Sequence, residues 1–150
     1  MTERVDFYVL KSATPKQRWA FACRLTEKAY LKNLKVVVLS DTLAEAQALD
    51  ELLWTFNERS FVPHKVCADE KSVDAATPVH LTAEPSAIPA ADLLINLAQR
   101  LPAHFRGYAR IAEVIDADEE RRRLGRERFK AYRDLKLHLE THQIDETADV

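Results

Sequence analysis

Val36-Val37-Val38-Leu39 is a short run of apolar, mainly β-branched residues, and it decides the fold class of this 150-residue chain. Such a run without polar alternation is typical of a parallel strand covered on both faces. Before it, apolar residues recur at helical spacing over 15–32, with Thr14 as a possible N-cap and Pro15 just after it. After it, Ser40 and Asp41 offer caps for a second helix. The core side chains expected in that helix are Ala46, Leu49, Leu53 and Trp54.

The rest of the chain continues this alternation of strands and helices. The β-forming run 5–10 comes first, so strand, helix, strand and helix follow one another and predict a right-handed βαβ unit. Pro78 favours an edge position for the strand that it opens, because proline lacks the N–H that a central strand needs. The further elements expected are a turn or short strand at 60–64, a surface loop at 68–77, strands at 78–82, 92–97 and 108–116, and a helix from 118 to about 139.

These elements predict one domain over residues 1–140, because no linker or internal repeat divides them. We expect a three-layer, Rossmann-like α/β fold with a mainly parallel sheet and helices on both faces. Residues 141–150 are acidic and polar, and we expect them to form a disordered tail.

Composition narrows the class of protein further. The chain is 47% hydrophobic and 31% charged, as in globular proteins. Its apolar runs are too short to cross a bilayer, and it begins without a signal-like region, so we expect a cytoplasmic protein. Cys23 and Cys67 are too few for a disulfide framework and are expected as reduced thiols.

Catalytic and cofactor motifs do not accompany this fold. Phosphate-binding loops need glycine where the backbone turns tightly against the ligand, and the two glycines, Gly107 and Gly125, do not follow the first strand. His64 and Cys67 have a chelating spacing but no second pair of ligands. We therefore expect no catalytic residue, cofactor or metal, and a protein that is not an enzyme.

A basic helix is the feature that remains. Residues 121–136 carry a net charge of +6, whereas the rest of the chain carries −8. Guanidinium groups beside an exposed aromatic ring suit a carboxylate attached to an apolar group. A solvated face with internal ion pairs is the alternative. Gly125 inside this helix is expected where another backbone comes close.

Three motifs in register give the sequence a specific resemblance. Leu49-Asp50-Glu51-Leu52-Leu53-Trp54, then Ser60-Phe61-Val62-Pro63-His64, resembles the L-D-x-x-L-W…F-V-P-H signature of the chi subunit of bacterial DNA polymerase III. Gly125-Arg126-Glu127-Arg128-Phe129-Lys130-Ala131-Tyr132-Arg133 is similar to that family's R-E-R-[YF]-[KR]-x-Y-R helix. The runs 6–10 and 92–97 fall in the expected order, so the resemblance covers about residues 5–136.

The resemblance implies an accessory subunit of the replicase. Such a protein binds the acidic C-terminal tail of single-stranded DNA-binding protein and reaches the clamp loader through the psi subunit, for which no binding motif is found here. It implies Arg126 as the main carboxylate partner, Arg122 and Lys130 beside the acidic stretch, and apolar contacts from Phe129, Trp54 and Phe61.

Two other functions remain open from the sequence. The basic helix over 121–136 could bind nucleic acid directly, although the acidic remainder of the chain opposes a polyanion. A nucleotide-dependent enzyme on the same fold is the third possibility.

Overall fold

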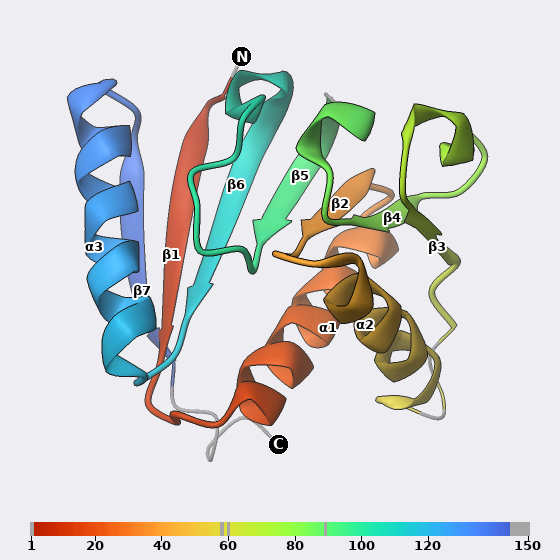
Figure 1. The fold of residues 1–150 in the computed structure, drawn as a ribbon, viewed down its shortest axis with the longest axis horizontal. Coiled ribbons are helices and arrows are strands. Elements are labelled where there is room, and N and C mark those ends of the chain that lie inside the picture. Colours follow the sequence, from red (N-terminus) through yellow and green to blue (C-terminus); the bar gives the residue numbers. More distant parts are fainter. Residues whose placement is uncertain (1, 58, 60, 89, 145–150) are drawn as a thin grey trace.

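A sheet of seven parallel strands forms the centre of the computed structural model, which describes residues 2–57, 59, 61–88 and 90–144 (Figure 1). The strand order is β3-β4-β2-β5-β6-β1-β7, and each neighbouring pair is parallel. The strands are β1 (Arg4–Leu10), β2 (Val36–Leu39), β3 (His64–Cys67), β4 (Val79–Thr82), β5 (Ala91–Asn96), β6 (Tyr108–Ile115) and β7 (Leu139–Ile144). The parallel sheet predicted from the sequence is confirmed.

Three α-helices connect these strands: α1 (Pro15–Leu31), α2 (Leu43–Thr55) and α3 (Glu119–Asp134). Pro15 occupies the first turn of α1, where its missing N–H costs nothing. Thr42, rather than Ser40 or Asp41, caps α2 by accepting a hydrogen bond from the Glu45 N–H at 3.1 Å. Short 3-10 helices lie at Glu70–Ser72, Pro85–Ala87 and Phe105–Gly107.

Helices cover both faces of the sheet, as predicted. Val36 and Val38 face the side on which α1 and α2 pack, whereas Val37 and Leu39 face the opposite side. Helix α3 packs on that opposite side, over β1, β6 and β7, and contributes Tyr132 to its core (Figure 1). Alternate residues of each central strand are therefore buried in different layers.

The predicted edge position of the strand that follows Pro78 is wrong. Strand β4 lies inside the sheet between β3 and β2, because Pro78 precedes the strand and removes no N–H from its ladder. A turn or short strand was expected at 60–64; residues 61–63 belong to no strand, and the edge strand β3 runs over His64–Cys67. The prediction that Trp54 of α2 belongs to the core is also wrong, because this side chain is 47% exposed.

The C-terminal part of the domain also differs from the prediction. Helix α3 ends at Asp134, and Lys136 adopts a left-handed conformation with φ 63° that reverses the chain. Residues 141–144 are not a disordered tail, because they belong to β7, which pairs with β1 from Val5↔Leu139 to Leu10↔Ile144. No glycine or proline marks this reversal, so the helical pattern seemed to continue. The remainder of the predicted tail, 145–150, lies outside the described residues.

No helix within the described ranges is long and apolar enough to cross a membrane.

Candidate functional site

A pocket of about 260 Å³ lies between helix α3 and the edge of the sheet formed by β1 and β7. Phe7, Val9 and Ile115 supply apolar surface from the strands. The Phe129 ring packs edge-on against Phe7, with 5.2 Å between the ring centroids. The full lining is Phe7, Val9, Ile115, Arg122, Gly125, Arg126, Phe129, Thr141 and Gln143.

Two arginines give this pocket its charge, and they differ in how they are held. Arg122 donates from Nε to the Asp116 carbonyl at 3.1 Å, and its Nη2 lies 3.5 Å from the Leu10 carbonyl. Arg126 is exposed and has no hydrogen bond or ion pair with any residue that the structure describes. A guanidinium group without a protein partner can form a bidentate pair with a carboxylate from a ligand.

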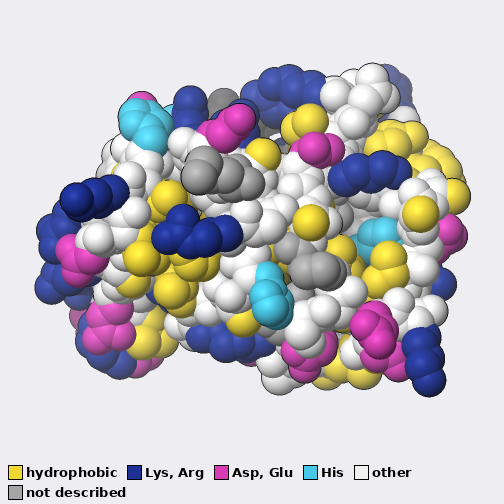
Figure 2. Space-filling model, turned by 90° about the horizontal axis from the view of Figure 1, so that it is seen from above, with side chains coloured by type: hydrophobic (Ala, Val, Ile, Leu, Met, Phe, Trp, Pro, Cys, Tyr) yellow, Lys and Arg dark blue, Asp and Glu magenta, His cyan; other side chains and the backbone are white. Residues whose placement is uncertain are grey.

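Other arginines of α3 are already paired, so they are poor candidates for ligand contacts. Arg123 contacts Glu120 and Glu127 within its own helix, at 2.5 and 3.1 Å. Arg121 pairs with Asp116 at 2.7 Å. In Figure 2, Lys and Arg side chains lie along the side of the molecule where α3 lies, interspersed with Asp and Glu. The basic helix thus contains paired arginines and also Arg126, which has no such partner among the described residues.

A buried polar network fixes the orientation of α3 over the sheet. The Glu113 carboxylate, fully buried in β6, accepts hydrogen bonds from Arg128 Nε at 3.1 Å and from Tyr132 Oη at 2.9 Å. Asn96 Nδ2 donates to the same carboxylate at 3.0 Å, and Arg128 also donates to the Gln99 carbonyl at 2.9 Å. Burial, together with the Glu113 charge, raises the pKa of Tyr132 far above its ordinary value. Because these side chains point inward, Arg126 and Phe129 are directed toward the pocket on the neighbouring side of the helix.

The close approach of α3 to the sheet depends on Gly125. A Cβ placed on this buried glycine would lie 2.4 Å from Ile115 Cδ1 and 3.3 Å from Ile115 Cγ1. The sequence predicted that another backbone would lie close to Gly125, and this is wrong, because the close neighbour is the Ile115 side chain of β6.

The structure brings together only part of the predicted site. Arg122, Arg126 and Phe129 line the pocket, and Lys130 is exposed on the next turn of α3. Trp54 and Phe61 do not join them. Trp54 lies on α2 and Phe61 just before β3, at the opposite edge of the sheet from β7. Six strand spacings of about 4.8 Å separate the two edges, or about 30 Å, so a ligand end held by Arg126 cannot also contact these rings.

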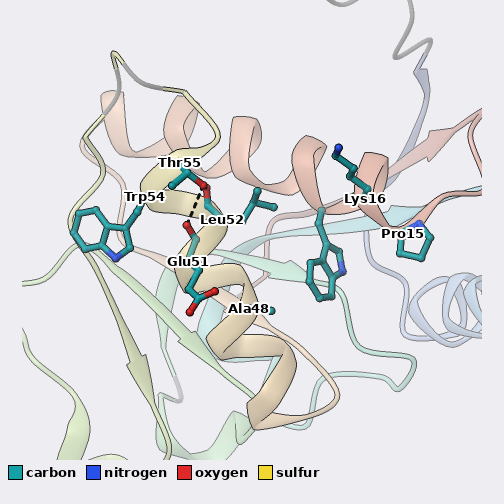
Figure 3. Close-up of a pocket in the computed structure, with 8 residues that line it drawn as sticks. Pro15, Lys16, Ala48, Glu51, Leu52, Trp54 and Thr55 are labelled. Carbon is teal, nitrogen blue, oxygen red and sulfur yellow. Dashed lines mark hydrogen bonds between the residues drawn. The ribbon is translucent and has the colours of Figure 1, made fainter.

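Trp54 and Phe61 instead form a separate aromatic cluster with His64. Trp54 is 47% exposed and Phe61 is 65% exposed, and the centroids of these two rings lie 5.5 Å apart. The ring centroids of His64 and Trp54 lie 4.2 Å apart, and His64 Nε2 lies 3.1 Å from an Asp50 carboxylate oxygen. A groove of about 760 Å³ separates α1 from α2 beside this cluster, with Lys16 and Leu52 on its opposite walls (Figure 3).

Sequence reasoning missed the contributions of β1 and β7 to the pocket. Thr141 and Gln143 were assigned to a tail, and Phe7 and Val9 were placed in the first strand without a role in a site. The alternation of Leu137 and Leu139 with polar residues was a signal for a strand, although a short one.

Among the described residues, potential metal ligands do not cluster and both cysteines are buried. The described part of the chain contains no group of three or more His, Cys, Asp or Glu side chains that could hold a metal ion. Cys23 and Cys67 are buried free thiols, and burial raises the pKa of Cys23 to about 12.

Together, the fold and this pocket define a three-layer α/β protein with a cationic surface pocket on an apolar floor. The family model for the DNA polymerase III chi subunit, HolC, matches residues 1–140. The chain is 35% identical to DNA polymerase III subunit chi of Pseudomonas aeruginosa over 94% of this chain and 96% of that protein. It is 26% identical to the Haemophilus influenzae subunit chi and 24% identical to that of Escherichia coli, over 96% and 93% of this chain and 99% and 97% of those proteins. The chain belongs to the family of DNA polymerase III chi subunits, accessory subunits of the polymerase in DNA replication.

Proposed function

We propose that this chi-family protein is a non-catalytic adaptor whose pocket beside α3 binds the acidic C-terminal tail of single-stranded DNA-binding protein. The supporting observation is Arg126, which lines a partly apolar pocket and has no ion pair or hydrogen bond with another described residue. A peptide that ends in an apolar residue presents a carboxylate and a hydrophobic side chain within a few ångströms of each other. The pocket offers a complement to both groups, since guanidinium and apolar surface adjoin there.

The acidic stretch that precedes such a peptide end would lie along the cationic side of α3. Arg122 borders the pocket, and Lys130 is exposed one turn beyond Arg126. These contacts are exposed to solvent and should add modestly to the affinity and more to the rate of association. A disordered tail bound in this way releases readily, because it loses conformational freedom on binding.

The aromatic cluster of Trp54, Phe61 and His64 supports the second half of the adaptor role. Large exposed aromatic side chains are typical of protein interfaces. We propose that this cluster is the surface that binds psi and thereby links the protein to the clamp loader. Because it lies about 30 Å from the α3 pocket by strand spacing, both partners could be bound at once.

Direct binding of nucleic acid by the basic helix is the second candidate, and the ion pairs of α3 weaken it. Arg121, Arg123 and Arg128 are each paired with carboxylates. A phosphate backbone would therefore meet fewer free cations than the charge of the segment suggests.

The experiment is a calorimetric titration with a peptide that matches the last ten or so residues of the host's single-stranded DNA-binding protein. Arg126→Ala should weaken binding about 10- to 150-fold, because hydrogen bonds to charged groups contribute about 1.5–3 kcal/mol. Arg123→Ala is the matched control, since Arg123 is on the same helix but already paired. Equal losses in both variants would indicate general charge attraction and count against the pocket.

Further experiments distinguish binding of the tail peptide from binding of DNA and of psi. A peptide without its terminal residue should not bind, and an oligonucleotide should not displace the intact peptide. Trp54→Ala with Phe61→Ala should abolish association with psi and leave the peptide affinity unchanged. Peptide binding that is lost in this double variant would contradict the separation of the two surfaces.

A further inference from the structure

The outer edge of β7 coincides with the pocket beside α3. Strand β7 pairs only with β1 among the described strands, so it forms one edge of the sheet. Thr141 and Gln143 line the pocket and are exposed. The pocket therefore lies beside an edge strand whose outward N–H and C=O groups could form hydrogen bonds with a ligand.

The hydrogen-bond register shows which backbone groups face outward. The Val5 N–H donates to the His138 carbonyl at 2.9 Å, and Val5 is aligned with Leu139. In a parallel ladder, alternate residues of a strand bond to the same neighbour. His138, Glu140 and His142 therefore bond toward β1, whereas Leu139, Thr141 and Gln143 direct their N–H and C=O groups away from the sheet.

The cations of α3 follow the same edge. Arg126 lines the pocket together with Thr141 and Gln143. Lys130 and Arg133 continue this row at spacings of four and three residues, which place them on the same side of the helix. Both are exposed, and Arg133 has only a 3.5 Å contact with its neighbour Asp134. A ligand lying along β7 would thus have positive charge beside it over most of its length.

The direction of α3 sets the direction of such a ligand. Arg122 lies near Leu10 at the carboxyl end of β1, and Phe129 packs on Phe7 further back. Helix α3 therefore runs antiparallel to the strands. A peptide whose terminal carboxylate is at Arg126 and whose acidic residues lie by Lys130 and Arg133 must run in the same direction as β7.

We infer that the acidic tail binds as an eighth, parallel strand on β7, with its backbone paired to Thr141 and Gln143 and its end in the pocket. This inference rests on the proposed function and adds the mode of binding to it. Strand addition derives affinity from main-chain hydrogen bonds, and side-chain contacts supply the specificity. Here the terminal carboxylate and the apolar pocket would select the peptide, and β7 would align the residues that precede its end.

The test is amide hydrogen exchange by NMR on the full-length protein, free and with saturating tail peptide. In the free protein, the amides of Thr141 and Gln143 should exchange rapidly, and those of His142 and Glu140 should be protected by β1. In the complex, Thr141 and Gln143 should become protected at least tenfold. Binding that leaves both amides unprotected would overturn strand addition while leaving the proposed function intact. A peptide that fails to bind at all would contradict the proposed function itself, and the inference with it.

Backbone N-methylation of the peptide gives a second, independent readout. Methylation at successive positions should weaken binding in a period of two, because only alternate peptide N–H groups would face β7. A loss of roughly tenfold is expected at the inward positions, since each methyl group removes a hydrogen bond and adds bulk. Gln143→Pro and Gln143→Ala form a matched pair in the protein, because both remove the side chain and only proline removes the outward N–H. Equal affinities for this pair and a flat methylation profile would both refute the inference.

Discussion

Replacing Gly125 with alanine tests how closely α3 is packed on the sheet. In an ordinary helix interior, this change stabilises by about 1 kcal/mol. Here the new Cβ would lie 2.4 Å from Ile115 Cδ1, so the buried Ile115 side chain or the helix must move. Overpacking of this kind costs about 1–3 kcal/mol. The balance predicts that Gly125→Ala lowers the free energy of unfolding by about 0–2 kcal/mol instead of raising it.

A double-mutant cycle isolates the contact that causes the loss. Ile115→Val removes Cδ1, the atom that the new Cβ would meet, and by itself should cost about 0.5–1.5 kcal/mol. In that background, Gly125→Ala should no longer clash at Cδ1 and should stabilise by up to about 1 kcal/mol. The two substitutions should therefore be coupled by about 1–3 kcal/mol.

Urea unfolding of the four proteins at 25 °C, followed by circular dichroism, measures this coupling. Slopes that agree among the four would show that the denatured states are comparable. The reasoning is refuted if Gly125→Ala stabilises the protein by about 1 kcal/mol in both backgrounds, because the glycine would then have no packing role.

Three further predictions concern buried groups. Tyr132→Phe should destabilise by about 1–3 kcal/mol, because the buried Glu113 carboxylate loses a donor; a neutral effect in thermal unfolding would contradict the network. The Asp6 carboxyl is desolvated, but hydrogen bonds from Arg4, His142 and Arg110 outweigh this and lower its pKa. The contribution of ionised Asp6 to the free energy of unfolding is fully present at a pH above its unfolded pKa of about 3.9. It is lost as the pH falls through the lower pKa of the folded protein. Asp6→Asn should flatten the pH dependence of unfolding in that acid range, and an unchanged profile would show that Asp6 makes no contribution. Cys23, with its pKa raised to about 12 by burial, should resist alkylation at pH 8 until urea unfolds the protein, and rapid labelling of the native state would disprove its burial.

Local patterns predicted most of the sheet and two of the helices correctly. The run 36–39 was recognised because a buried parallel strand needs apolar residues on both faces, and α1 and α2 because their apolar residues recur at helical spacing. The end of α3 could not be predicted in this way. Lys136 adopts its left-handed turn without glycine, and β7 is stabilised by pairing with β1, which is remote in sequence.

In the candidate site, too, contacts within one helix could be predicted from the sequence, whereas contacts that depend on the order of the strands could not. Arg122, Arg126 and Phe129 share one side of a single helix, so helical geometry alone predicted that they would lie together. Whether Trp54 and Phe61 join them depends on the order of strands in the sheet, which no local pattern encodes. That order places their edge about six strand spacings from β7.

The position of β1 between β6 and β7 has a consequence for how the chain folds as it is made. Val5 is aligned with Ile111 on one side and with Leu139 on the other, so the first strand has no partner until β6 has been made and lacks its second neighbour until β7 has been made. At a synthesis rate of about 5–20 residues per second, β6 follows the first strand after roughly 5–21 s and β7 after roughly 7–27 s. During that time an apolar segment is exposed on the nascent chain, and the high proportion of such distant pairings should make folding slow for a domain of this size. Binding of a chaperone to the first strand of ribosome-bound chains, followed by release once β7 has emerged, is the expected pattern.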